Sequence, residues 1–180
     1  MKNRIIICIL FLSIIPTYVC SDSLEYKIKA SFLEKFTRFI EWPSNIIEDN
    51  FEPFTISVIG KNPFDEILDI MYSNIKILNM QVKIRYISNA YEIYKTNILF
   101  ISEQRCASLT EILSVVKDKP ILTVSDSIGY AEKGVHINFY KTRDNKIRFE
   151  INKTAVQKSG LKMSYLLLRL AKIIDTSVKE

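Results

Sequence analysis

The sequence predicts an α/β fold in three layers, with a mostly parallel central sheet, helices on both of its faces, and a C-terminal hairpin plus helix. Three observations support this class. Residues 97–102 and 120–125 are continuous apolar segments, which is typical of strands buried on both faces. The segment 106–117 between them has helical spacing, and strand, helix, strand in this order indicates parallel pairing. With 180 residues and 48% hydrophobic content, the chain can form one core.

The N-terminal segment has the plan of a secretory signal peptide. Lys2 and Arg4 precede an apolar run, Ile5 to Ile15, that is too short to span a bilayer comfortably. We expect residues 1–21 to be a signal peptide that is removed, and residues 22–180 to form one exported domain.

The sequence allows other fates for this segment. Cleavage after Ser21 places small residues at both required positions, and cleavage after Cys20 is the alternative. An uncleaved membrane anchor is another reading. A lipid anchor on Cys20 is less well supported, because the three residues before it, Thr17 to Val19, do not match a lipoprotein processing site.

The charge balance argues against a nucleic-acid partner. The formal net charge is +5, and loss of residues 1–21 removes two basic residues and no acid, which leaves +3. No cluster of Lys and Arg is long enough to follow a phosphate backbone. We therefore expect no nucleic acid, and contact with a membrane only through a partner.

Cysteine usage excludes an internal disulfide in the predicted exported chain. Of the three cysteines, only Cys106 lies outside the predicted signal peptide. Its place at the expected start of a helix indicates a partly buried structural thiol.

The first predicted helix covers residues 22–41. Asp22 and Glu25 are placed as a capping pair, and the helix is expected to stop at Trp42, because Pro43 disfavours helical geometry at the residue before it. Its apolar stripe has helical spacing and consists of Leu24, Ile28, Phe32, Phe36 and Phe39.

Strands and helices are then expected to alternate. Residues 54–60 form a buried strand, and residues 61–71 a helix with Asn62 as its N-cap. Residues 74–88 alternate apolar and polar side chains around Asn79, as two short strands or one bent strand would.

The C-terminal third changes pattern. Residues 135–152 have two alternating segments joined by the turn sequence 143–146, which predicts an antiparallel hairpin. A last helix is expected over residues 161–174, with an apolar stripe formed by Met163, Leu166, Leu167, Leu170, Ala171 and Ile174.

Candidate catalytic groups are sparse. His136 is the only histidine and lies in an alternating strand, so we interpret it as a hydrogen-bonded structural residue. One His and one Cys cannot supply a zinc or copper site, and the four glycines form no phosphate loop or dinucleotide fingerprint. We predict no catalytic residue, no metal, no cofactor and no enzyme activity.

A ligand pocket is predicted from topology alone. Gly60, Ser102, Ser125 and Asp126 follow or end predicted parallel strands, and the carboxyl edge of an open α/β sheet tends to hold ligands. Ser125 and Asp126 can instead satisfy backbone donors where the strand leaves the sheet.

Several stretches together resemble, in order and spacing, the YfiR-like family of exported bacterial proteins, over nearly all of residues 24–174. The stretches are KASFLEKFTRFIEWP, FTISVIGKNPF, ILFIS, ILTVSDSIGYAEKGVHINFY and KIRFEINKTAVQKSGLKMSYLLLRLAKII.

The resemblance implies a periplasmic, often dimeric regulator rather than a catalyst. Such a protein binds the sensor domain of a membrane-anchored diguanylate cyclase and holds it inactive, which limits cyclic di-GMP and biofilm growth. The resemblance implies that the FEIN segment and the apolar positions just after it contribute to the partner surface, with Trp42 as an exposed anchor. These residues are Trp42, Glu150, Ile151, Asn152 and Val156.

A function from another class is left open. A periplasmic accessory module would load a small ligand at the strand edge and present it to a receptor, a transporter or a histidine kinase. Some relatives carry disulfides tied to redox sensing, but with Cys106 alone an internal redox bond is not expected here.

Overall fold

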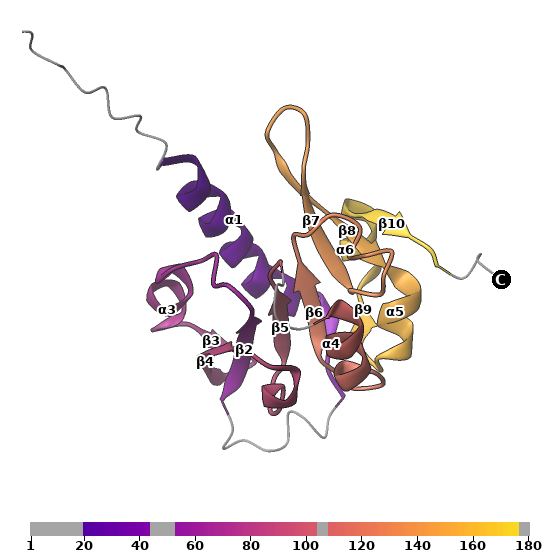
Figure 1. Ribbon diagram of the computed structural model, residues 1–180, viewed down its shortest axis with the longest axis horizontal. Coiled ribbons are helices and arrows are strands. Elements are labelled where there is room, and N and C mark those ends of the chain that lie inside the picture. The colour runs from indigo at the N-terminus through magenta and orange to yellow at the C-terminus, as the bar shows by residue number, and fades with distance from the viewer. Residues whose placement is uncertain (1–19, 44–52, 104–107, 177–180) are drawn as a thin grey trace, which may run out of the picture.

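A computed structural model describes residues 20–43, 53–103 and 108–176, and it confirms a three-layer α/β fold with a mostly parallel sheet (Figure 1). The sheet has eight strands in the order β10-β8-β7-β6-β5-β2-β4-β3. The central strands are parallel, whereas β7 and β8, and β3 and β4, pair antiparallel.

The strand bounds are β1 (Ile40–Glu41), β2 (Phe54–Ile59), β3 (Lys76–Ile77), β4 (Met80–Ile87), β5 (Ile98–Ile101), β6 (Leu122–Ser125), β7 (Ile137–Lys141), β8 (Ile147–Asn152), β9 (Lys162–Met163) and β10 (Lys172–Ile174). The helices are α1 (Cys20–Thr37), α3 (Ile67–Tyr72), α4 (Leu109–Val116), α5 (Lys153–Lys158) and α6 (Tyr165–Leu170), with a 3-10 turn η1 (Ala90–Glu92).

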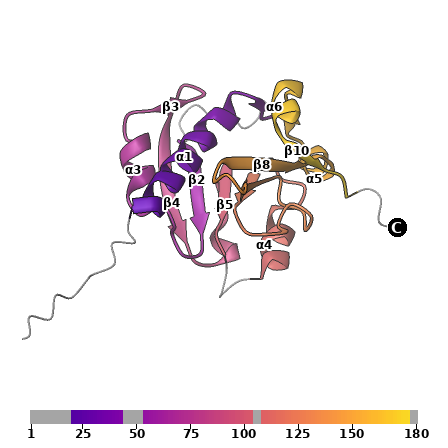
Figure 2. The same ribbon diagram turned by 90° about the horizontal axis from the view of Figure 1, so that it is seen from above.

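Two apolar clusters lie on opposite faces of the sheet. The larger cluster packs α1, α3, α5 and α6 against the central strands, through side chains such as Leu33, Phe36 and Phe100. The smaller one packs α4 and η1 against the other face, through Ile101 and Ile112. Figure 2 shows α1 and α6 on one side of the strands and α4 on the other. Alternation of side chains along each strand explains why both faces need a cover.

Two antiparallel hairpins form, one at residues 135–152, where the sequence predicts it, and one within residues 74–88, where the sequence left two short strands or one bent strand open. The β3–β4 turn has Leu78 and Asn79 at φ 52° and 64°, the left-handed pair that a tight hairpin needs. In the β7–β8 turn the Thr142 amide donates to the Lys146 carbonyl, and Asn145 takes φ 60°. Residues 74–88 are therefore two strands rather than one bent strand.

The predicted first helix is wrong in its start and its end, and two of the five residues of its apolar stripe are exposed. The helix begins at Cys20, before the supposed cap, and ends at Thr37, after which Ile40 and Glu41 pair with β9. The buried positions include Lys29, Ala30, Leu33 and Phe36, whereas Leu24 and Ile28 are exposed. The buried face of the helix therefore differs from the predicted stripe. The second half of α1 packs on the sheet, whereas its first half extends beyond the sheet.

The expected role of Asn62 as an N-cap is also wrong. Its side chain accepts from the Phe64 amide and donates to the Asp65 carbonyl, which makes a local turn, and α3 begins only at Ile67. Asp65 has φ 49°, so the backbone has not entered a helix there.

The predicted single helix over residues 161–174 is three elements instead, namely β9, α6 and β10. Ser164 caps α6 by accepting from the Leu166 amide, and Ala171 returns to extended geometry. The chain then pairs beside β8, where β-branched Ile173 and Ile174 fit a strand. Among the predicted stripe residues, Leu167 is the one that is fully buried.

The predicted signal peptide lies almost wholly outside the described residues, as does Cys106. Within the described ranges, no helix combines the length and the apolar content that crossing a membrane requires.

Candidate functional site

The four predicted ligand-binding residues lie together at the carboxyl edge of the parallel strands. Gly60 follows β2, Ser102 follows β5, and Ser125 ends β6 with Asp126 directly after it. The expected juxtaposition is therefore present. Whether a ligand binds there stays a prediction.

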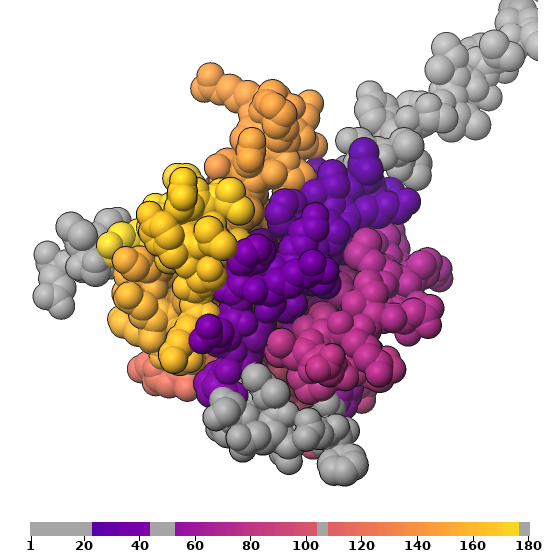
Figure 3. Space-filling view, turned by 180° about the vertical axis from the view of Figure 1, so that it is seen from behind, coloured from indigo at the N-terminus to yellow at the C-terminus, as the bar shows by residue number. Residues whose placement is uncertain are grey.

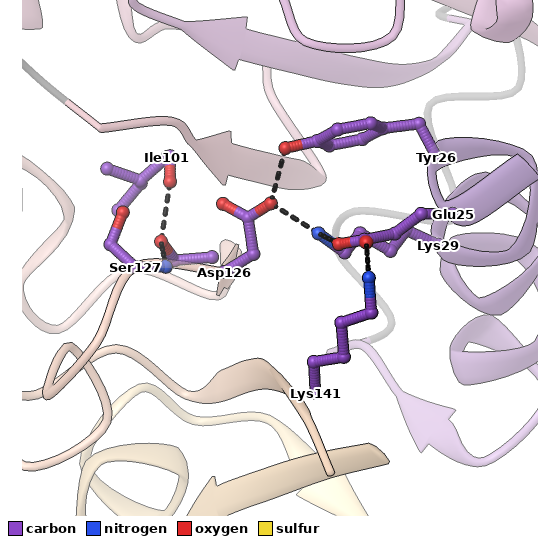
Figure 4. Close-up of polar contacts among 8 residues, drawn as sticks. Glu25, Tyr26, Lys29, Ile101, Asp126, Ser127 and Lys141 are labelled. Atoms are coloured by element: carbon purple, nitrogen blue, oxygen red, sulfur yellow. Dashed lines mark hydrogen bonds and ion pairs between the residues drawn. The ribbon is translucent and has the colours of Figure 1, made fainter. Parts of the chain in front are cut away.

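The polar groups at this edge are engaged within the protein. The Ser125 hydroxyl donates to the Ile101 carbonyl at 2.6 Å and accepts from the Ser127 amide at 3.2 Å (Figure 4). The amides of Gly60 and Ser102 donate to the carbonyls of neighbouring strands. The Ser125 bonds match the alternative reading, in which this serine satisfies a backbone donor where the strand leaves the sheet, whereas the Asp126 side chain accepts from two side chains of α1.

Asp126 is bound by the N-terminal helix. Its Oδ2 atom accepts from the Tyr26 hydroxyl at 2.9 Å and from the Lys29 Nζ at 2.6 Å (Figure 4). Lys29 also pairs with Glu25 at 2.6 Å, and Glu25 in turn accepts from Lys141 on β7 at 3.1 Å. We refer to Glu25, Tyr26, Lys29, Asp126 and Lys141 as the α1 polar network.

The α1 polar network is electrostatically balanced. Burial raises the pKa of Glu25, but hydrogen bonds from Lys29 and Lys141 outweigh burial, so that its pKa lies below its ordinary value. Lys29 has little solvent exposure and is held between two carboxylates. The network therefore fastens α1 across the edge at which the ligand pocket was predicted.

Two shallow hollows open on the described surface, and neither is lined by the four edge residues. One, of about 250 Å³, lies between α1 and the β7–β8 hairpin and is lined by Leu24, Glu25, Ile28, Lys141, Asn145 and Ile147. The other lies on α3 and is lined by Glu66, Asp69, Ile70 and Ser73.

Trp42 is buried, and the expectation of an exposed anchor is wrong. Its ring packs edge-to-face on Phe54 at 5.5 Å between centroids, within the larger apolar cluster. The indole Nε1 is buried and has no hydrogen-bond partner among the described residues. The indole acts as a core side chain because β1 brings it over the start of β2.

The FEIN residues are buried as well. Glu150 accepts from Lys172 of β10 at 3.1 Å and from Asn138 of β7 at 3.3 Å, so it joins three strands. Ile151 and Val156 belong to the larger apolar cluster. These side chains are therefore not exposed for direct contact with a partner, and their role toward a partner stays a prediction.

Asn152 organises the region after β8. Its Oδ1 accepts from the Ala155 amide at 2.8 Å and caps α5, while its Nδ2 donates to the Ala131 carbonyl at 2.7 Å. The side chain thus fixes both the helix and the loop that precedes β7, which gives this residue a framework role.

His136 is a structural histidine, as the sequence indicates. Its Nδ1 accepts from the Thr123 amide at 3.2 Å, and its own amide donates to the Thr123 hydroxyl at 2.9 Å. Burial lowers the pKa of His136 to about 4, so that the ring is neutral at neutral pH. Within the described ranges, no group of three or more His, Cys, Asp or Glu side chains is placed to hold a metal ion.

The exposed apolar side chains of the C-terminal elements were missed by the sequence reading. Tyr165 is 72% exposed, Leu166 59%, Leu170 68% and Ile173 42%. We call these four residues the C-terminal apolar surface. The sequence predicts a single helix with one apolar stripe here, and the signal of an exposed surface is that the segment holds more leucines than one buried helix face can use.

The burial of Lys29 could not be predicted from the sequence either. This residue lies on the face of α1 that also buries Ala30 and Leu33. A lysine with Glu25 at i−4 is typical of an exposed ion pair on a helix. Nothing in the sequence indicates that Asp126, 97 residues later, also binds this lysine.

Comparison with known proteins adds to this picture. No curated protein matches the chain. Among solved structures, the chain is similar to the ABC domain in complex with L-Trp from Streptococcus pneumonia, with 10% identity and a TM-score of 0.49. The match covers 67% of this chain and 55% of that one, so the chain spans about half the length of that structure.

The family model described as YfiR/HmsC-like matches residues 26–172. This range runs from within α1 to the first residue of β10 and includes every described element between them. The family is one of periplasmic regulatory proteins that act in cyclic di-GMP signalling. The match confirms the resemblance seen in the sequence, and the chain belongs to the YfiR/HmsC-like family.

Proposed function

We propose that the protein is a periplasmic repressor that binds the sensor domain of a membrane-anchored diguanylate cyclase and thereby lowers cyclic di-GMP and biofilm formation. Family membership supports this proposal. The structural observation that carries it is the C-terminal apolar surface, since Tyr165, Leu166, Leu170 and Ile173 are large apolar side chains exposed on adjoining elements.

The chemistry of this surface suits a protein partner. Grouped exposed apolar side chains mark interaction sites, and aromatic and aliphatic anchors contribute most of the binding energy. The strand next to it, β10, pairs with β8 on one side only and is an edge of the described sheet. A partner can therefore add both apolar contacts and backbone hydrogen bonds.

The buried FEIN residues support the surface from beneath. Glu150 binds Lys172 on β10, and Asn152 caps α5, which leads to β9 and α6. We propose that Trp42, Glu150, Ile151, Asn152 and Val156 affect the partner by holding these elements in place. No step of this function requires catalysis.

The test is co-purification of tagged protein with a membrane-anchored diguanylate cyclase from its host, together with a cyclic di-GMP reporter. Leu166→Asp with Leu170→Asp should abolish recovery of the cyclase and raise the reporter signal. Ile70→Asp with Ile128→Asp is the matched control, because these side chains are 70% and 97% exposed elsewhere. Recovery of no cyclase by the wild type, or equal effects of both pairs, contradicts the proposal.

We propose a homodimer as the free form of this repressor. Sedimentation of wild type and of both double variants measures it. A monomer at all concentrations contradicts the dimer without affecting the cyclase proposal.

A further inference from the structure

One end of the molecule is both basic and apolar. It is formed by the N-terminal half of α1 and by the β7–β8 hairpin, which lie side by side at the top of Figure 3 and are joined by the Lys141–Glu25 ion pair. We call this the basic end. Its exposed members are Leu24, Lys27, Ile28, Lys141, Arg143, Lys146 and Arg148.

The charges of the basic end do not cancel. Lys27, Lys141, Arg143, Lys146 and Arg148 are exposed cations. The acids of the same segments are Asp22 together with Glu25 and Asp144, which pair with Lys141 and Lys146, so an excess of two positive charges remains. The buried Lys29–Asp126 pair adds nothing to this balance. Removal of residues 1–21, which the sequence predicts, would place an α-ammonium group here as well.

Apolar side chains lie among these cations. Leu24 is 62% exposed and Ile28 is 37% exposed, and both line the hollow of about 250 Å³ together with Ile147. Lys141 and Asn145 belong to the same hollow. A set of cations around a small apolar area is typical of segments that lie at a lipid interface.

We propose that the basic end binds an anionic phospholipid surface, with the hairpin cations near lipid phosphates and Leu24 and Ile28 at the headgroup boundary. The side-chain types favour lipid over an acidic protein. Protein interfaces are enriched in aromatic side chains and depleted of lysine, whereas three of the five cations here are lysines, and the strongly exposed tyrosines, Tyr91, Tyr94 and Tyr165, lie on other elements. This inference does not depend on the proposed repressor function, because it concerns another end of the molecule. It departs from the expectation, drawn from the net charge, that the protein contacts a membrane only through a partner.

The test is co-sedimentation of the exported protein with vesicles of phosphatidylcholine, with or without phosphatidylglycerol. Binding is expected only to the anionic vesicles and should weaken as salt is added. Arg143→Glu with Lys146→Glu should reduce the partition coefficient at least about 20-fold, because each cation near an anionic surface contributes roughly fivefold. Leu24→Ser should weaken binding several-fold at any salt concentration.

The matched control is Lys117→Glu with Lys119→Glu. These exposed lysines precede β6, whereas Asp126 follows β6 and contacts α1, so they lie at the opposite edge of the sheet. The control has the same net charge as the hairpin variant and should bind nearly as well as wild type.

Three outcomes overturn the inference. The first is sedimentation of the wild type equally with both vesicle types, or with neither. The second is an equal loss of binding by the hairpin and control variants, which would show a net-charge effect. Loss of cyclase recovery by the hairpin variant, with vesicle binding unchanged, would assign the basic end to a protein partner.

Discussion

Lys29 of α1 lies 2.6 Å from Asp126 at the end of β6, and both side chains are largely withdrawn from solvent, at 5% and 13% exposure. The pair joins the first helix to the middle of the sheet. Because Glu25 also contacts Lys29, one cation serves two carboxylates at this point.

Replacement of this lysine should be strongly destabilising. Lys29→Met leaves Glu25 and Asp126 without their shared cation, and we expect the free energy of unfolding to fall by about 3 kcal/mol. Asp126→Asn should cost less, since Lys29 keeps Glu25. Urea unfolding at neutral pH measures both, and a Lys29→Met protein as stable as wild type would contradict the role of the network.

Stability should fall on mild acidification because of His136. Burial lowers its pKa from the ordinary 6.5 to about 4 in the folded protein, so between these pH values the unfolded chain takes up a proton that the folded protein does not. The contribution is complete above pH 6.5 and is lost as the pH falls toward 4, by about 3 kcal/mol in total.

The matched variant for this prediction is His136→Asn, which keeps an acceptor near the Thr123 amide but does not titrate in this range. The difference in unfolding free energy between wild type and variant should decline as the pH falls from 6.5 to 4. A difference that does not change with pH would contradict the prediction, because His136 is the only histidine in the chain.

Alanine should be tolerated less well at Gly134 than at Gly129. Gly134 has φ +115° and its added Cβ would lie 3.4 Å from a Leu113 methyl, whereas Gly129 has φ +77° with 4.0 Å to the nearest atom. We expect Gly134→Ala to cost about 2–3 kcal/mol and Gly129→Ala about 1 kcal/mol. Thermal unfolding of the pair decides, and the reverse order would refute the backbone argument.

Asn152→Ala should cost more than the loss of an ordinary helix cap. It removes the acceptor for the Ala155 amide and the donor to the Ala131 carbonyl in a buried place, for which we expect about 2–3 kcal/mol. Ser164→Ala removes only the exposed cap of α6 and should cost about 1 kcal/mol. Chemical denaturation compares them, and equal losses would mean that the Ala131 bond contributes nothing.

The parallel sheet could be predicted because its strands carry their own signal. The segments at β2, β5 and β6 are apolar throughout, and a strand buried on both faces needs that pattern. The β7–β8 hairpin could be predicted from its turn residues, including Asn145, whereas the pattern around Asn79 also allowed one bent strand.

Helix faces and the C-terminal elements could not be predicted equally well. Leu24 and Ile28 fit a helical stripe. Which face of the helix is buried depends on where the sheet ends, and this is set by tertiary packing rather than by local sequence. The segment from Leu166 to Ile174 has too many apolar residues for either a helix or a strand to be preferred by spacing.

The candidate site shows the same division. Ser125 and Asp126 were placed at the strand edge from topology, but their partners, Ile101, Tyr26 and Lys29, come from other elements. The burial of Trp42 and Glu150 likewise depends on β1 and β10, two short strands that no local sequence pattern predicts.

The attachment of α1 constrains the order in which the fold can form. Tyr26 and Lys29 find their acceptor about a hundred residues later, and Phe36 packs on Phe139 and Phe149 from β7 and β8. A chain that emerges from its N-terminus can first dock this helix on Phe64 and Tyr72, about 40 residues later, but not on β6, β7 or β8. The contacts of α1 are complete only when the final third of the chain is present, and such long-range contacts slow folding.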